Sequence, residues 1–168
     1  MRSFERARPG DAEAIETLFE AAKRAGRLNG TTDWDEDYPN REIIDEDIAR
    51  GELWALTEDG GMIATISLLP EDFEDGLDAG WTDAHSCVLA RLCVDPSLQG
   101  RGVGAEMMRL VTREAARQGY RATRHLASVD NPAALRLYRK LGYRELSQVR
   151  CYDMDFIAFE RLIEPEGE

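Results

Sequence analysis

The residues best suited to chemistry lie in a glycine-rich segment, between an apolar stretch that ends at Val94 and a helical pattern over residues 102–117. The segment reads Gln99-Gly-Arg-Gly-Val-Gly-Ala105. Glycine lets a backbone approach an anion closely. At a helix N-terminus, free N–H groups and the helix dipole favour a phosphate. The segment therefore predicts a cradle for a pyrophosphate group.

Other phosphate motifs fit this segment poorly. Gly100-x-Gly102-x-x-Ala105 has the spacing of a dinucleotide fingerprint, but that motif needs its first glycine directly after the strand and an acidic residue about 20 positions later. Here residues 95–99 intervene, and residues 120–124 contain no carboxylate. The Gly-Lys-Ser/Thr of a nucleoside-triphosphate loop is absent. A plain glycine-rich turn stays open as the alternative.

A second informative segment, residues 131–143, places a phenol inside a short helix. A capping asparagine, Asn131, precedes a proline, and Gly142 ends the pattern, as is typical of a helix. Asn131 is a helix cap, a ligand-binding residue or both. Tyr138 is able to act as a general acid, although a tyrosine in an apolar helix is more often a packing residue.

Together and in this order, the two segments resemble the GNAT superfamily of N-acetyltransferases. Gln99, Gly102 and Gly104 match the family's Gln/Arg-x-x-Gly-x-Gly/Ala signature. Residues 131–143 are similar to its Asn-x-x-Ala-x-x-Leu-Tyr-x-x-x-Gly-Phe pattern, with Tyr143 for Phe. The Trp-x-x-x-Tyr-Pro-Asn segment further upstream looks like one subset of uncharacterised members.

The resemblance implies an α/β fold over a single domain, residues 1–168. This GNAT fold has a single mixed, mostly antiparallel twisted sheet with a splayed central strand pair flanked by helices. The implied activity is an acetyl-CoA-dependent N-acetyltransferase that transfers an acetyl group to a primary amine by direct attack on the thioester. The alternative is a non-catalytic acyl-CoA-binding or sensor module on the same fold, because a fold does not guarantee chemistry.

The resemblance also implies a role for individual residues. The pantetheine arm would bond to the strand end formed by Leu92, Cys93 and Val94, and the Val94 N–H would polarise the thioester carbonyl. Asn131 would contact the pantetheine, and Tyr138 would protonate the departing CoA thiolate. The pyrophosphate would lie on the N–H groups from Gly100 to Ala105. The whole glycine-rich segment would complete the cofactor site: Gln99, Gly100, Arg101, Gly102, Val103, Gly104 and Ala105. Candidates for the 3′-phosphate are Arg101, which we favour, Arg136, Arg139 and Lys140.

The general base is not assigned by the resemblance. An alkylammonium with a pKa near 10 must lose a proton before it attacks. Many family members carry a carboxylate five residues before the motif asparagine, but this chain has Leu126 there. His85, His125 and a carboxylate from the acidic N-terminal half stay open, although we expect each histidine to be buried and hydrogen-bonded instead.

The acceptor amine is expected between the first two helices and the late strands. Trp34 and Tyr38 lie in the first inter-helix segment and are the candidate substrate residues, with packing against the sheet edge as the alternative. The same segment holds the carboxylates Asp33, Asp35, Glu36 and Asp37. Aromatic and acidic side chains together suit a cation, so we expect a small cationic amine or a peptide amine.

Charge and composition narrow the partners. The net charge is −12, which argues against nucleic-acid binding. Residues 91–150 nevertheless hold 12 of the 21 Lys and Arg but 5 of the 33 Asp and Glu, so a basic segment suited to a phosphorylated cofactor lies within an acidic chain. The three cysteines have no metal-ligand spacing, and Cys87 and Cys93 are expected to be buried. We expect no metal, no membrane association, a cytoplasmic location and a homodimer.

Apolar periodicity and turn residues predict four helices and six strands. Helices are expected over 9–26, 41–51, 102–117 and 132–141. Strands are expected over 53–56, 62–69, 85–94, 121–127 and a final antiparallel pair, 143–150 and 152–162. This order of elements is that of a mixed α/β sheet.

Overall fold

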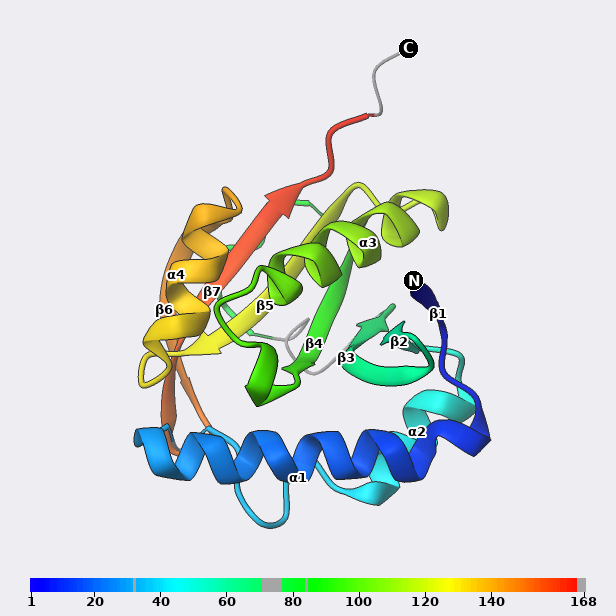
Figure 1. The fold of residues 1–168 in the computed structure, drawn as a ribbon. Helices are drawn as coiled ribbons and strands as arrows, with labels where there is room; N and C mark the ends of the chain where they lie inside the picture. The colour runs from blue at the N-terminus through cyan, green and yellow to red at the C-terminus, as the bar shows by residue number, and fades with distance from the viewer. Residues whose placement is uncertain (32, 71–76, 84, 166–168) are drawn as a thin grey trace. The chain divides into compact units, whose positions relative to one another are not determined.

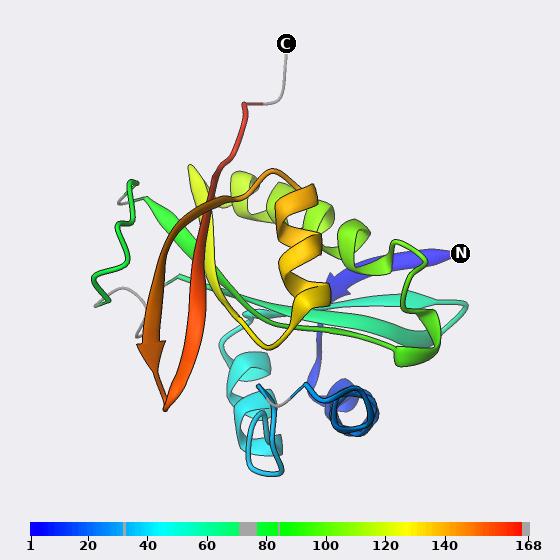
Figure 2. The same ribbon diagram turned by 90° about the vertical axis from the view of Figure 1, so that its left-hand side faces the viewer.

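The computed structural model describes residues 1–31, 33–70, 77–83 and 85–165. Its strands form a mixed seven-stranded sheet of order β1-β2-β3-β4-β5-β7-β6 (Figure 1, Figure 2). The β4–β5 pair is parallel, whereas the β1–β2, β2–β3, β5–β7 and β6–β7 pairs are antiparallel. The expected α/β class with a mixed, mostly antiparallel sheet and flanking helices is confirmed.

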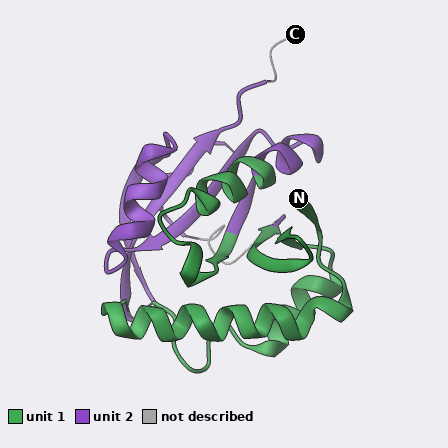
Figure 3. Ribbon diagram, in the orientation of Figure 1, with its two compact units in different colours: residues 1–68, 90–111 green, residues 69–89, 112–168 purple. Residues whose placement is uncertain are grey.

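The chain divides into two compact units (Figure 3). Unit 1 comprises residues 1–68 and 90–111, and unit 2 comprises residues 69–89 and 112–168. The elements β4 (Ser86–Val94) and α3 (Val103–Arg117) each have several residues in both units. The remaining elements of unit 1 are β1 (Arg2–Arg6), η1 (Pro9–Asp11), α1 (Ala12–Asn29), α2 (Arg41–Ala49), β2 (Leu53–Glu58), β3 (Gly61–Leu69, whose last residue falls in unit 2) and η3 (Pro96–Leu98). Those of unit 2 are β5 (Ala122–Ser128), α4 (Pro132–Lys140), β6 (Arg144–Cys151) and β7 (Met154–Leu162).

Unit 1 packs α1 and α2 around a shared apolar cluster. The apolar stripe of α1, including Ile15 and Phe19, is buried there with Ile44 and Ile48 of α2. The prediction that α1 ends at Gly26 is wrong, because the helix continues to Asn29. The left-handed residue that ends it is Gly30, with φ 78°, the conformation glycine favours after a helix.

The first strand, β1, was not expected from the sequence. It pairs with β2 from Arg2 opposite Glu58 to Arg6 opposite Trp54. Four of its five side chains are exposed and only Phe4 is half-buried. A strand that buries so little carries no apolar alternation from which to predict it.

In unit 2, α4 lies against one face of the three antiparallel strands β5, β7 and β6 (Figure 2). β5 pairs with β7 from Ala122 opposite Leu162 to Ser128 opposite Phe156, and β6 pairs along the other edge of β7. The last strand begins at Met154 rather than at the expected Tyr152. Tyr152 and the residue after it have φ values of 51° and 58°, so they form the hairpin turn.

Among the described residues, none of the helices is both long enough and apolar enough to span a bilayer. The same residues contain no group of three His, Cys, Asp or Glu side chains arranged to hold a metal ion.

Candidate functional site

The end of β4 leads through a fixed turn into the glycine-rich loop of unit 1. Cys93 is buried, whereas Leu92 and Val94 on either side of it are half-exposed. The Asp95 N–H donates to the Ile63 carbonyl oxygen at 2.8 Å, which ties the strand end to β3. The Asp95 carboxylate accepts from the Ser97 N–H at 2.9 Å and so caps η3. The loop therefore starts from a defined position.

Two glycines shape the loop before α3. Gly100 and Gly102 both have φ of 80°, and a Cβ built on either would meet no atom within 4 Å. Only glycine adopts this conformation at little cost, so the requirement is conformational and the space beside the backbone is open. Both residues are exposed. This is the arrangement expected where a backbone approaches a ligand.

The N-terminus of α3 is suited to an anion. The first N–H groups of a helix have no intrahelical acceptor and lie at the positive end of its dipole. Glu106 lies in the first turn and would repel an anion, but its carboxylate pairs with the Arg2 guanidinium. Arg101 is exposed in the loop. The backbone and charges present thus fit the predicted pyrophosphate cradle.

Unit 2 holds the other predicted motif residues, Asn131 and Tyr138. The Asn131 side-chain oxygen accepts from the Ala134 N–H at 3.1 Å, which confirms its role as the cap of α4. The Tyr138 side chain is 9% exposed. Its ring lies 4.0 Å from the His125 ring, centre to centre, and 5.5 Å from that of Phe159. The motif tyrosine thus lies in an aromatic cluster between α4, β5 and β7.

The two histidines differ from the expectation that each is buried and hydrogen-bonded. His125 is buried, but within the described chain neither ring nitrogen has a hydrogen-bond partner. Burial lowers its pKa to about 3. A group with so low a pKa is a weak acceptor for the proton of an alkylammonium, so His125 does not suit the role of base. His85 is exposed, just before β4, with its ring 5.6 Å from that of Tyr120.

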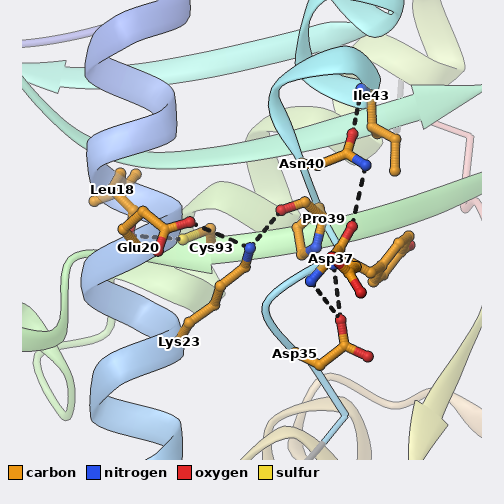
Figure 4. Close-up of polar contacts among 10 residues, drawn as sticks. Leu18, Glu20, Lys23, Asp35, Asp37, Pro39, Asn40, Ile43 and Cys93 are labelled. Atoms are coloured by element: carbon orange, nitrogen blue, oxygen red, sulfur yellow. Dashed lines mark hydrogen bonds and ion pairs between the residues drawn. The ribbon is translucent and has the colours of Figure 1, made fainter.

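The segment between α1 and α2 is held by local contacts (Figure 4). Trp34 is half-buried, and its ring centre lies 5.4 Å from that of Phe19, which supports the packing interpretation. The Asp35 carboxylate accepts from the N–H groups of Asp37 and Tyr38, both at 2.8 Å. This carboxylate shapes the turn. Glu36 and Asp37 are exposed and Asp33 is half-exposed.

A buried cation fixes the end of the same segment. The Lys23 ammonium of α1 donates to the Pro39 carbonyl oxygen at 2.6 Å and to the Glu20 carboxylate at 3.3 Å (Figure 4). Asn40 then caps α2 by accepting from the Ile43 N–H at 3.0 Å, as expected. The C-terminal end of the segment is thus anchored to both α1 and α2.

Tyr38 has a partner that the sequence did not suggest. Its side chain is 40% exposed, and its hydroxyl oxygen accepts from the Arg91 guanidinium at 3.4 Å. Arg91 also donates to the buried Asp47 carboxylate at 2.6 Å. A carboxylate on the apolar face of α2, between Ile44 and Ile48, was the available signal, because a buried charge needs a partner.

The candidate 3′-phosphate residues are not equivalent. All of them are exposed. Arg139 is paired with the Glu145 carboxylate at 2.6 Å, which leaves it less suited to a phosphate than Arg101, Arg136 or Lys140.

Known proteins resemble this chain both in sequence and in fold. An uncharacterised N-acetyltransferase of Methanocaldococcus jannaschii is 26% identical over 102 residues, which are 58% of this chain and 45% of that protein. The chain thus spans less than half the length of this curated relative.

Solved structures share the fold over nearly the whole chain. A GNAT-family acetyltransferase of Streptococcus agalactiae has a TM-score of 0.86 at 23% identity, covering 98% of this chain and 96% of that one. The structure of yncA, a putative acetyltransferase of Salmonella typhimurium with its cofactor acetyl-CoA, has a TM-score of 0.72 at 18% identity, with 99% and 96% covered.

The family itself is identified by sequence. The model of the family described as "Acetyltransferase (GNAT) family" matches residues 13–143, which include β4, the glycine-rich loop and the Asn131–Tyr143 motif. The chain therefore belongs to the GNAT acetyltransferase family, a family of acyltransferases.

Proposed function

We propose that this protein is an N-acetyltransferase that uses acetyl-CoA as its donor and a primary amine, either a small cationic amine or a peptide amine, as its acceptor. The observation that supports it best is the exposed loop of left-handed glycines, Gly100 and Gly102, between the end of β4 and the start of α3. The loop offers backbone N–H groups where family members bind a pyrophosphate. The Salmonella relative with bound acetyl-CoA supports the same donor.

In this proposal the backbone of unit 1 binds the donor. Leu92, Cys93 and Val94 hold the pantetheine arm, and residues 99–105 hold the pyrophosphate. The Val94 N–H donates to the thioester carbonyl oxygen and stabilises the negative charge that develops there as the amine attacks. Arg101 pairs with the 3′-phosphate.

The side chains of unit 2 serve the leaving group. Tyr138 donates its phenolic proton to the CoA thiolate as the carbon–sulfur bond breaks. Asn131 contacts the pantetheine while its side-chain oxygen caps α4. The aromatic cluster keeps the Tyr138 ring in one orientation, which a proton donor requires. The general base stays unassigned among His85, a carboxylate of the N-terminal half and a water molecule held by either.

The test is release of the free CoA thiol from acetyl-CoA with a panel of polyamines, aminoglycosides, amino acids and short peptides. Release with one class would establish the enzyme and name its acceptor. Binding of acetyl-CoA with no release across the panel would favour the alternative, a non-catalytic acyl-CoA-binding module. Absence of acetyl-CoA binding would contradict both.

A matched glycine pair separates binding from folding. Gly102→Ala and Gly60→Ala each force a side chain into a left-handed conformation, with φ of 80° and 85°, where the added Cβ meets no atom. Each should cost about 1 kcal/mol of unfolding free energy. Only Gly102→Ala should weaken acetyl-CoA binding, by about tenfold or more, because Gly60 lies in the β2–β3 turn. Calorimetric titration with acetyl-CoA measures the difference, and equal affinities would contradict the assigned loop.

Three expectations stay predictions: a cytoplasmic location, a homodimer, and one acetyltransferase domain that comprises both units. Sedimentation of the purified protein decides the oligomeric state.

A further inference from the structure

Arg91 precedes the strand end that we assign to donor binding, and its backbone is in the left-handed conformation. Arg91 has φ of 57°, a conformation that costs a residue with a side chain about 1–2 kcal/mol. It lies three residues before Val94, a distance of roughly 10 Å along a strand. A residue in this conformation redirects the strand that follows it. Its neighbours must therefore supply contacts that keep it there.

Those contacts come from three other parts of unit 1. Asp47 of α2 accepts from Arg91 at 2.6 Å, and the Ser67 hydroxyl of β3 donates to the same carboxylate oxygen at 2.6 Å. The Tyr38 hydroxyl accepts from the guanidinium at 3.4 Å. Asp47 and Ser67 are 5% and 2% exposed. We call Ser67, Asp47, Arg91 and Tyr38 the Arg91 network.

The charge of the network is fixed. Burial lowers the pKa of Arg91, but Tyr38 and Asp47 raise it by more, so the guanidinium stays protonated. An arginine cannot adapt to a lost partner by becoming neutral. Its planar group joins two partners at set angles, which a lysine does not reproduce. The network is therefore a stiff connection between α2, β3, β4 and the segment that carries Tyr38.

We propose that Arg91 is a positioning residue: it fixes the course of β4 so that the Val94 N–H meets the thioester carbonyl, and it ties this strand end to Tyr38 in the expected acceptor segment. The inference rests on the proposed function, because it needs Val94 to serve the donor. Misplacement of a catalytic group by about 1 Å can lower a rate by about a hundredfold. The network thus affects turnover more than donor binding.

Arg91→Gly is the decisive variant. Glycine accepts the left-handed backbone without cost, so only the side-chain contacts are lost. We expect kcat for thiol release from acetyl-CoA, with the amine that the wild type accepts, to fall by about 10- to 100-fold. The affinity for CoA, measured by calorimetric titration, should fall less than kcat, by at most about threefold, because the pyrophosphate loop is intact although the strand end that holds the pantetheine arm is displaced.

Two gentler variants keep the proposal testable if Arg91→Gly folds poorly. Tyr38→Phe removes one hydroxyl, and kcat should fall by about two- to fivefold. Arg91→Lys keeps the charge beside Asp47 but cannot also reach Tyr38 in the same geometry, so its kcat should lie between those of the wild type and Arg91→Gly. Asp59→Gly is the matched control, because Asp59 is another left-handed residue of unit 1, with φ of 50°, in the exposed β2–β3 turn. Its kinetics should equal those of the wild type.

The outcomes separate this inference from the proposed function. Wild-type protein that binds no acetyl-CoA or releases no thiol would contradict the proposed function, and the inference would fall with it. With an active wild type, Arg91→Gly turnover within about twofold of normal would overturn the positioning role. A parallel loss of CoA affinity and kcat would indicate that Arg91→Gly is generally unfolded, and Arg91→Lys then decides: a kcat equal to that of the wild type would overturn the positioning role.

Discussion

Each of the two compact units holds an ionisable side chain that is mostly shielded from solvent, and the two units do so in opposite ways. Arg91 of unit 1 remains charged and is matched by Asp47 at 2.6 Å. His125 of unit 2 lies among the rings of Tyr138, Tyr143 and Phe159, and its nitrogens have no hydrogen-bond partner in the described chain. One region contains an ion pair, and the other contains a neutral imidazole packed like an apolar ring.

The difference follows from the chemistry of the two groups. A guanidinium cannot lose its proton in a protein, so burial demands a counter-ion. An imidazole can stay neutral, at the cost of unsatisfied nitrogens and a lowered pKa. The ion pair joins α2 to β4 in a defined geometry. The aromatic cluster supplies a rigid, apolar support for α4 that becomes vulnerable in acid.

Removing the counter-ion tests the first half of this comparison and has the largest expected effect. Asp47→Ala leaves the mostly buried Arg91 guanidinium without its counter-ion, so the unfolding free energy should fall by about 3 kcal/mol in urea titrations. Asp45→Ala is the matched control on the same helix, since its ion pair with Arg41 is largely exposed. It should change stability by less than about 0.5 kcal/mol. Equal effects would show that the Arg91 pair contributes no more than a surface pair.

Lowering the pH tests the second half of the comparison, the buried neutral imidazole of His125. The unfolded chain binds a proton at His125 below pH 6.5, whereas the folded chain resists until about pH 3. Stability is therefore lost as the pH falls through this window, by at most about 1.4 kcal/mol per pH unit. At pH 5 the loss attributable to His125 should be about 2 kcal/mol relative to pH 8.

His125→Leu isolates this contribution from that of the carboxylates. The variant lacks the titrating group, so its loss of unfolding free energy between pH 8 and pH 5 should be about 2 kcal/mol smaller than that of the wild type. Parallel pH profiles for the two proteins would mean that His125 is accessible to protons in the folded state.

The smallest expected effects compare two helix caps, one in each unit. Asn40→Ala and Asn131→Ala each remove a side-chain oxygen that accepts an N–H bond, at 3.0 Å and 3.1 Å. Each should cost about 1 kcal/mol of unfolding free energy. Only Asn131→Ala should also weaken CoA binding, by about three- to tenfold, because we assign it a pantetheine contact. Titration with CoA checks this, and equal affinities in the two variants would leave Asn131 as a cap alone.

Features that depend on local chemistry were predictable from the sequence. Asn40 and Asn131 were expected to cap their helices, and both do. The glycine-rich loop was expected to let the backbone approach a ligand closely, and the space beside Gly100 and Gly102 is open. Such signals require only neighbours in sequence.

Features that depend on distant partners were not predictable. The exposed β1 carries little apolar pattern, and its strand identity comes from pairing with β2. The left-handed Arg91 is stabilised by Asp47, 44 positions away. His85 and His125 were expected to be hydrogen-bonded in the interior, but exposure and burial depend on how the sheet packs. Asp35 appeared suited to attracting a cation, whereas its carboxylate closes a turn.

The burial of two cysteines has a practical consequence for following the reaction. Burial raises the pKa of Cys87 and of Cys93 to about 12, so both stay as unreactive thiols at assay pH. Cys151 is half-exposed. A thiol-specific dye should therefore label about one cysteine per native chain and all three after denaturation. Slow growth of the dye signal without acyl donor would then measure transient opening of the core, so the reagent that reports turnover also reports unfolding.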